Sequence, residues 1–178
     1  MSGRHLPPVH VVAMGVSATG KTTVAQALAE ELDLEMIEGD NFHSPANIAK
    51  MAEGVPLTDQ DRLPWLRSLA DLIEQRDAEE TSTVLACSAL RRSYRDVLRG
   101  ASSNSGLFFV HLHADFAVLL DRMGHRTKHF MPASLLESQF ETLEPLETDE
   151  PGALVDVTAP LDEVVAEAVR SVLAHAPR

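Results

Sequence analysis

The stretch Gly15-Val16-Ser17-Ala18-Thr19-Gly20-Lys21-Thr22 follows directly on an apolar run, His10-Val11-Val12-Ala13-Met14. It fits the pattern G-x-x-x-x-G-K-[ST], in which glycines let backbone N–H groups curl around phosphate oxygens and the next helix adds its positive end. That helix is indicated by apolar residues at helical spacing, namely Val24, Ala27, Leu28 and Leu32. Because strand, loop and helix occur in the required order, the stretch predicts a phosphate-binding loop that grips a nucleoside triphosphate.

The loop also predicts ligands for the individual groups of the nucleotide. Lys21 is expected to reach the β- and γ-phosphates, and the Thr22 hydroxyl is expected to bind Mg²⁺. The predicted nucleotide-binding residues of this region are Gly15, Ser17, Ala18, Thr19, Gly20, Lys21, Thr22 and Thr23. The motif alone leaves open whether the triphosphate serves group transfer, motion or a switch.

Length and charge limit the class of protein. The 178 residues suit one domain, which we expect over residues 9–178 after a flexible tail at 1–8. The formal net charge of −12 argues against general binding to nucleic acid or anionic membranes. A single cysteine, Cys87, and the lack of a signal-peptide pattern or long apolar span favour the reducing cytoplasm. The histidines show no metal-ligand spacing.

Short apolar runs alternate with amphipathic segments along the chain. The runs predict strands at residues 9–16, 36–37, 83–89, 107–112 and 154–157. Nearly all of their residues are apolar, as in a parallel sheet that helices cover on both faces. The sequence therefore predicts a five-stranded α/β sandwich.

Capping residues predict where several helices begin. Ser44-Pro45 predicts the start of a helix that ends near Gly54. Thr58 with Asp61 resembles a capping box that opens a second helix. In this second helix Pro64 either lies in the first turn or kinks the helix. Further helices are indicated by apolar stripes that we expect in the core: Phe116, Leu119, Leu120 and Met123; Leu135, Leu136, Phe140 and Leu143; Leu161, Val164, Val165, Ala168 and Val172.

Polar residues cluster at three places that should lie at the carboxyl ends of strands, where open parallel sheets bind ligands. The clusters are Glu38-Gly39-Asp40-Asn41-Phe42-His43, Asp59-Gln60-Asp61-Arg62-Leu63-Pro64-Trp65 and residues 87–96.

These clusters carry a resemblance to a known family. Gly39-Asp40-x-x-His43, Asn47-x-x-Lys50-Met51-x-x-Gly54-x-Pro56-Leu57 and Asp59-x-Asp61-Arg62-x-Pro64-Trp65-Leu66 resemble gluconokinases of the small phosphate-loop type. Cys87-Ser88-Ala89-Leu90, Tyr94-Arg95-Asp96-x-Leu98-Arg99 and the segment 129–144 match in order. The resemblance implies a three-layer α/β/α sandwich with a five-stranded parallel sheet, a nucleoside monophosphate kinase-like phosphate-loop fold and a helical lid at about 122–143. Ala18 departs from the family pattern, which usually has a glycine there; we expect the methyl group to be tolerated.

The resemblance further implies transfer of the ATP γ-phosphoryl group to the terminal hydroxyl of D-gluconate, with Mg²⁺ as cofactor and a homodimer as the assembly. Such a transfer needs cations on the migrating group and a carboxylate at the attacking hydroxyl. Asp40 is the candidate carboxylate, although an Asp after a strand also serves as a turn cap. Arg62 is the candidate for binding the gluconate carboxylate, with a surface ion pair to Asp59 or Asp61 as the alternative.

Further candidates for the substrate pocket are weaker, namely His43, Lys50, Trp65, Arg91 and His129. A loop His and a Lys are often solvated, and a Trp in an apolar stripe is usually core.

The predicted lid has its own candidates. Arg122 and Arg126 share a helical face in a basic segment, and in the family resembled they would neutralise charge on the transferred group; an ordinary solvated face is the alternative. Pro160 follows the last strand, where related kinases border the adenine, but it also suits a helix start.

Two other functions stay open at this point: a kinase of another small acceptor, such as shikimate or a nucleoside monophosphate, and a nucleotide-dependent switch that is not a kinase.

Overall fold

A computed structural model describes residues 7–100, 106–125 and 132–176. Its core is one sheet of five parallel strands in the order β2-β3-β1-β4-β5. The strands are β1 (His10–Met14), β2 (Glu35–Glu38), β3 (Thr83–Ala86), β4 (Leu107–His113) and β5 (Gly152–Asp156). The predicted five-stranded parallel sheet is therefore confirmed.

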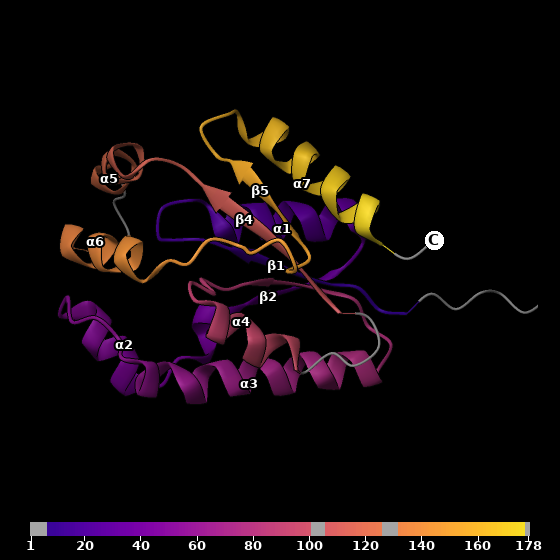
Figure 1. The fold of residues 1–178 in the computed structure, drawn as a ribbon, viewed down its shortest axis with the longest axis horizontal. Helices are drawn as coiled ribbons and strands as arrows, with labels where there is room; N and C mark the ends of the chain where they lie inside the picture. The colour runs from indigo at the N-terminus through magenta and orange to yellow at the C-terminus, as the bar shows by residue number, and fades with distance from the viewer. Residues whose placement is uncertain (1–6, 101–105, 126–131, 177–178) are drawn as a thin grey trace, which may run out of the picture.

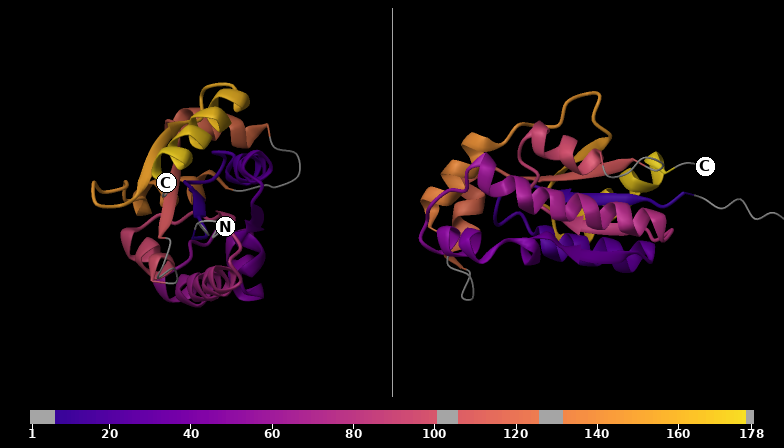
Figure 2. Two further views of the ribbon diagram at one scale, coloured as in Figure 1. Left: turned by 90° about the vertical axis from the view of Figure 1, so that its right-hand side faces the viewer. Right: turned by 90° about the horizontal axis from the view of Figure 1, so that it is seen from below.

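Helices cover both faces of the sheet (Figure 1), which completes the three-layer sandwich. Helices α1 (Lys21–Leu32) and α7 (Leu161–His175) pack together on one face, and α3 (Asp59–Ala78) and α4 (Arg92–Arg99) pack together on the other. Figure 2 shows the same layers from two further sides. The elements η1 (Gly39–Phe42), α2 (Pro45–Ala52), α5 (Phe116–Gly124) and α6 (Ala133–Thr142) lie toward the carboxyl ends of the strands.

The three central strands are short and mostly apolar because they are covered on both sides. Every residue of β1 and β3 is buried, as are the first six of the seven residues of β4. Strand β1 is central: β2 and β3 follow on one side of it, and β4 and β5 then follow on the other side. A crevice forms at the carboxyl end of such a switch point, and the predicted phosphate loop leaves β1 there.

Local signals place the helix starts well. The Ser44 side chain accepts from the Asn47 amide at the start of α2, and Thr58 with Asp61 forms a complete capping box at the start of α3. Pro64 is the sixth residue of α3, beyond the first turn, and the helix continues through it. The carbonyl of Gln60 consequently lacks its usual intrahelical donor.

Other expectations need correction. Strand β3 ends at Ala86, three residues before its predicted end, because the chain turns through Ala89, whose φ is 45°. Residues 92–99, part of a polar cluster with no predicted helix, form α4. The stripe residues Leu120 and Leu161 were expected in the core, but they are 38% and 50% exposed. Leu161 is the first residue of α7, where the helix begins.

One buried ion pair fastens α4 to the segment that precedes β5. Arg95 and Glu150 have no exposed side-chain surface, and two hydrogen bonds of 2.8 and 2.9 Å join them. The Arg95 guanidinium also donates to the carbonyls of Ala89, Leu90, Glu144 and Pro145. This one side chain therefore fixes the loop after β3 to the segment after α6.

Among the helices described, none combines the length and the apolar composition that crossing a membrane requires.

Candidate active site

The loop between β1 and α1 has the backbone of a phosphate cradle. A Cβ atom on Gly15 would lie 2.6 Å from the Leu112 carbonyl oxygen, and φ at Gly15 is +146°, so only glycine fits there. Ala18 adopts φ 68°, the left-handed region that disfavours a Cβ atom. The loop thus accepts the methyl group at a cost in backbone strain. Lys21 Nζ donates to the Val16 carbonyl across the loop at 3.0 Å.

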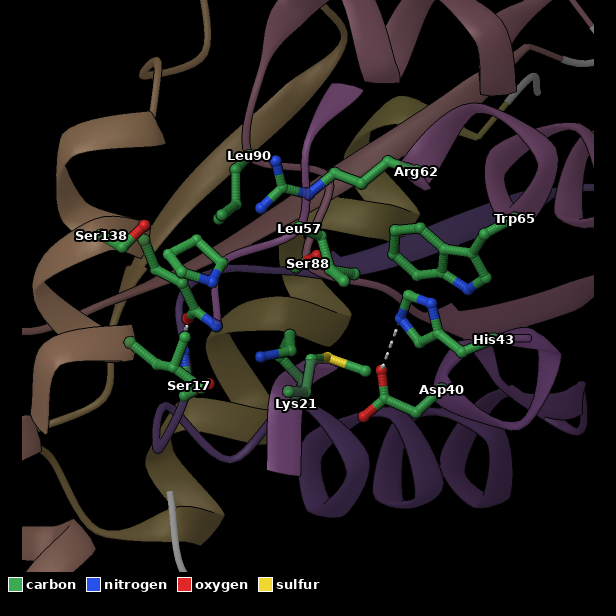
Figure 3. Close-up of a pocket in the computed structure, with 14 residues that line it drawn as sticks. Ser17, Lys21, Asp40, His43, Leu57, Arg62, Trp65, Ser88, Leu90 and Ser138 are labelled. Atoms are coloured by element: carbon green, nitrogen blue, oxygen red, sulfur yellow. Dashed lines mark hydrogen bonds and ion pairs between the residues drawn. The ribbon is translucent and has the colours of Figure 1, made fainter. Parts of the chain in front are cut away.

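One pocket joins this loop to the polar clusters (Figure 3). Six predicted site residues line it: Ser17, Lys21, Asp40, His43, Arg62 and Trp65. Eight further residues complete its wall, namely Met51, Pro56, Leu57, Ser88, Leu90, Leu135, Ser138 and Gln139. The phosphate loop, the carboxylate after β2 and the arginine of α3 therefore share one cleft.

Asp40 lies in η1, immediately after β2. Gly39 allows this approach, because a Cβ there would lie 2.4 Å from the Ala86 carbonyl oxygen of the neighbouring strand. Trp65 Nε1 donates to the Gly39 carbonyl at 2.8 Å and so holds the backbone beside Asp40. The Asp40 side chain is 76% exposed and borders the pocket, and the following helix α2 is capped by Ser44 instead.

His43 is held beside Asp40 by packing and by a hydrogen bond. Its ring stacks on Trp65, with centroids 4.1 Å apart, and its Nδ1 accepts from the Asn47 amide at 3.4 Å. Burial lowers the pKa of His43, outweighing the opposite effect of Asp40, and Arg62 lowers it further. A neutral imidazole with its proton on Nε2 results, and Nε2 lies 3.9 Å from the Asp40 carboxylate.

Arg62 turns its guanidinium into the pocket from the first turns of α3 (Figure 3). Its Nη1 donates to the Tyr94 hydroxyl at 3.0 Å, and the Tyr94 hydroxyl in turn donates to Asp59. Within the described part of the chain Arg62 forms no ion pair, because Asp59 binds Tyr94 and Arg91, and Asp61 binds Lys50. The alternative of a surface ion pair to either aspartate is therefore not what the structure has.

Two other predicted substrate residues face elsewhere. Lys50 Nζ lies 2.8 Å from Asp61 Oδ2, and this hydrogen bond is the main reason that the pKa of Asp61 falls to about 2. Arg91 Nη1 lies 3.3 Å from Asp59 Oδ2. Neither side chain lines the pocket, since each is turned to its carboxylate partner.

The predicted lid is described only in part. Arg122 Nη2 donates to the Val157 carbonyl at 2.5 Å, so it lies next to the loop after β5, and Pro160 precedes α7 at the end of that loop. Arg126 and His129 lie outside the described residues. From α6, Gln139 Oε1 accepts the Ser17 backbone N–H of the phosphate loop at 2.7 Å.

Sequence reasoning missed several residues of the site. Glu38 Oε2 accepts the Thr22 hydroxyl at 2.5 Å, which puts a carboxylate beside the predicted Mg²⁺ ligand. Its position at the end of β2 was a usable signal. Ser88 and Leu90 belong to the polar cluster at residues 87–96, and Ser138 and Gln139 belong to the matching segment 129–144, but none of the four was singled out as a site residue. Only folding brings the loop after β3 and helix α6 to the phosphate loop.

Comparisons with known proteins agree with this geometry. A family model described as an AAA domain matches residues 11–146. A gluconokinase of Gluconobacter oxydans is 47% identical over 165 residues, which are 93% of this chain and 92% of the relative. The chain belongs to the gluconokinase family. A solved gluconokinase of Sinorhizobium meliloti is 49% identical, with a TM-score of 0.84 over 97% of this chain and 95% of that one. An unliganded sugar kinase of Janibacter is 48% identical, with a TM-score of 0.90 over 97% of this chain and 100% of that one.

Proposed function

We propose that this protein transfers the γ-phosphoryl group of ATP to the terminal hydroxyl of D-gluconate, giving 6-phospho-D-gluconate and ADP. The observation that carries the proposal is the single pocket shared by the phosphate-loop residues Ser17 and Lys21, the Asp40 carboxylate and the Arg62 guanidinium. The 47% identity to a gluconokinase over nearly the whole chain supports the choice of acceptor.

The pocket separates the tasks of a phosphoryl transfer. Lys21 and the loop amides bind the phosphates. Asp40 accepts the proton of the acceptor hydroxyl while the oxygen of that hydroxyl bonds to the γ-phosphorus and the bond from this phosphorus to ADP breaks. Neutral His43 places its Nε2 3.9 Å from the Asp40 carboxylate, beyond hydrogen-bonding distance, and so adds a polar neighbour that does not neutralise it. Little covalent help is needed, because positioning and charge stabilisation supply most of the rate.

The acceptor is recognised at the opposite wall. The Arg62 guanidinium matches a carboxylate with parallel hydrogen bonds, and its lack of an acidic partner among the described residues leaves it available. His43 and Trp65 present a flat surface beside it, and Ser88 and Ser138 supply hydroxyls for a polyol chain.

Mg²⁺ fits the oxygen ligands present beside the phosphate loop. The Thr22 hydroxyl and the Glu38 carboxylate are hydrogen-bonded neighbours, and both are hard oxygen donors of the kind that Mg²⁺ prefers. These two side chains would hold the ion, which neutralises phosphate charge when it is bound.

The segment 122–143 would close over the nucleotide as a lid of the single domain at 9–178. Arg122 already lies beside the loop after β5, where Pro160 would border the adenine, and the contact between Gln139 and Ser17 brings α6 onto the phosphate loop. Arg126 would act with Arg122 on the transferred group, and His129 would reach the acceptor. Closure would exclude water, which competes with gluconate for the phosphoryl group.

The cellular setting is part of the proposal. A cytoplasmic location is supported by the single cysteine, Cys87, whose burial raises the pKa of its thiol to about 12 and keeps it protonated.

A homodimer is supported by exposed apolar side chains on the edge strand β5 and on α7, namely Leu154, Leu161 and Leu173. The molar mass in solution, measured by light scattering for the wild type and for Leu154→Lys, tests the dimer.

The function is tested by a coupled assay of ADP release with gluconate, shikimate and nucleoside monophosphates as acceptors, and with ATP alone as control. We expect turnover with gluconate far above that with any other compound. Preferred use of shikimate or a nucleoside monophosphate would indicate a different small-molecule kinase, and equal ATP hydrolysis with and without acceptors would indicate a switch.

A further inference from the structure

A phenol rather than a carboxylate holds the Arg62 guanidinium. Arg62 Nη1 donates to Tyr94 Oη at 3.0 Å, and the guanidinium carbon lies 5.4 Å from the centre of the Tyr94 ring. The same oxygen, Tyr94 Oη, is hydrogen-bonded to Asp59 Oδ1. Because a guanidinium only donates and a carboxylate only accepts, the hydroxyl proton points to Asp59 and a lone pair points to Arg62.

Asp59 and Arg62 would otherwise be natural ion-pair partners. They are three residues apart in the first turn of α3, a spacing that makes side chains neighbours on a helix. In the structure they bind opposite sides of one hydroxyl oxygen. A direct pair would occupy the guanidinium N–H groups that a substrate carboxylate needs.

Tyr94 is suited to separate the two charges. It is 5% exposed and comes from α4, which packs against α3. Burial and the hydrogen bond to Asp59 raise the pKa of the Tyr94 phenol above its usual value of 10, so the hydroxyl stays protonated at neutral pH. The other Asp59 oxygen, Oδ2, lies 3.3 Å from Arg91 Nη1, and this contact holds Asp59 in place. We call the hydrogen-bonded series Arg62, Tyr94 and Asp59 the relay.

We propose that Tyr94 is a positioning residue that sets acceptor specificity: its hydroxyl holds Arg62 over the pocket and keeps Asp59 from pairing with it. The remaining guanidinium N–H groups then stay available to the carboxylate of a sugar acid. The inference rests on the proposed function and adds to it the reason that an acceptor with a carboxylate is selected.

The first test compares kinetics of the wild type, Tyr94→Phe and the control Ser93→Ala, an exposed neighbour on α4. Tyr94→Phe should raise the KM for gluconate about tenfold or more, because Arg62 loses its partner and turns to Asp59. D-Glucitol lacks the carboxylate, so we expect its turnover to be poor already in the wild type. This turnover and the KM for ATP should change less than about twofold, since neither depends on a charge-assisted contact with Arg62. An unchanged KM for gluconate in Tyr94→Phe would overturn the proposal.

The double variant Asp59→Asn with Tyr94→Phe separates this role from mere packing. The neutral amide introduced at position 59 cannot form an ion pair, so the double variant should recover most of the affinity for gluconate that Tyr94→Phe loses. Asp59→Asn alone should stay within about threefold of the wild type, because the amide oxygen still accepts from the Tyr94 hydroxyl. A double variant no better than Tyr94→Phe would show that competition by Asp59 is not the cause.

A crystal structure of Tyr94→Phe gives a readout that needs no activity. We expect the Arg62 guanidinium to be bonded directly to Asp59, and an Arg62 that keeps its wild-type position would refute the relay. Absence of gluconate turnover in the wild type would refute the proposed function, whereas the crystal structure would still decide the role of Tyr94.

Discussion

Replacement of Glu150 by glutamine removes the negative charge from the most deeply buried ion pair among the described residues. Arg95 then keeps its positive charge with no exposed surface, and its remaining partners are neutral backbone carbonyls. Removing one partner of a buried pair typically costs ~3–5 kcal/mol. The introduced amide retains one acceptor oxygen, so we expect about 3 kcal/mol, which corresponds to a fall in Tm of about 6–12 °C for a chain of this length.

Urea unfolding at pH 7, followed by circular dichroism, measures this loss, and Glu147→Gln is the matched control. Glu147 pairs with Arg92 but its side chain is 62% exposed, so its replacement should leave the urea midpoint unchanged within error. A loss below about 1 kcal/mol for Glu150→Gln, at an unchanged m value, would refute the view that this pair fastens α4 to the segment before β5.

The pH dependence of the same pair has a definite sign. Burial by itself would raise the pKa of Glu150, but hydrogen bonds from Arg95, the Glu147 amide and Arg99 outweigh it and hold the pKa at about 2, below the ordinary 4.5. A depressed carboxyl pKa gives stability that is present above the unfolded value and is lost as the pH falls. The wild type and Glu150→Gln should therefore converge in stability between pH 4.5 and pH 2. A difference that stays constant across this window would contradict the assignment.

Four further predictions concern catalysis. Asp40→Asn should lower kcat by roughly 10²–10⁴-fold while the Kd of a non-hydrolysable ATP analogue, measured by calorimetry, stays the same; near-normal turnover would remove Asp40 from the mechanism. Arg62→Lys keeps the positive charge but loses the planar guanidinium that binds a carboxylate through two parallel hydrogen bonds. The KM for gluconate should therefore rise about tenfold with the KM for ATP unchanged, and an unaltered KM for gluconate would count against the role of Arg62. Glu38→Gln should shift activation by Mg²⁺ to about tenfold higher concentration in a metal titration, and an identical titration curve would exclude Glu38 as a ligand. Arg126→Ala should lower kcat by about 10³-fold in single-turnover assays, and an intact rate would refute its role in the lid.

Sequence patterns predicted the parts of the fold that depend on local chemistry. The phosphate loop was readable because its glycines, lysine and threonine act within eight consecutive residues. The buried strands were readable because burial on both faces leaves mostly apolar residues, and the start of α3 was readable because Thr58 and Asp61 cap it within one turn. Helix α4 was missed because four of its eight residues are charged, since Arg92, Arg95 and Arg99 bind carboxylates of distant segments.

The partners of the site's charged residues could not be read from the chain. Lys50, Arg62 and Arg91 were all candidates for binding the acceptor, and all three lie near carboxylates in the sequence or in the fold. Arg62 is the one of the three without a carboxylate partner among the described residues. This depends on Tyr94, 32 residues from Arg62 along the chain, and on the pairing of Asp61 with Lys50. The sequence by itself determined that the chain forms a parallel α/β sandwich with a phosphate loop, because those features follow from local periodicity and backbone chemistry. Only the tertiary structure decided which of these cations lines the pocket, because the competition among ion pairs depends on distances that packing alone sets.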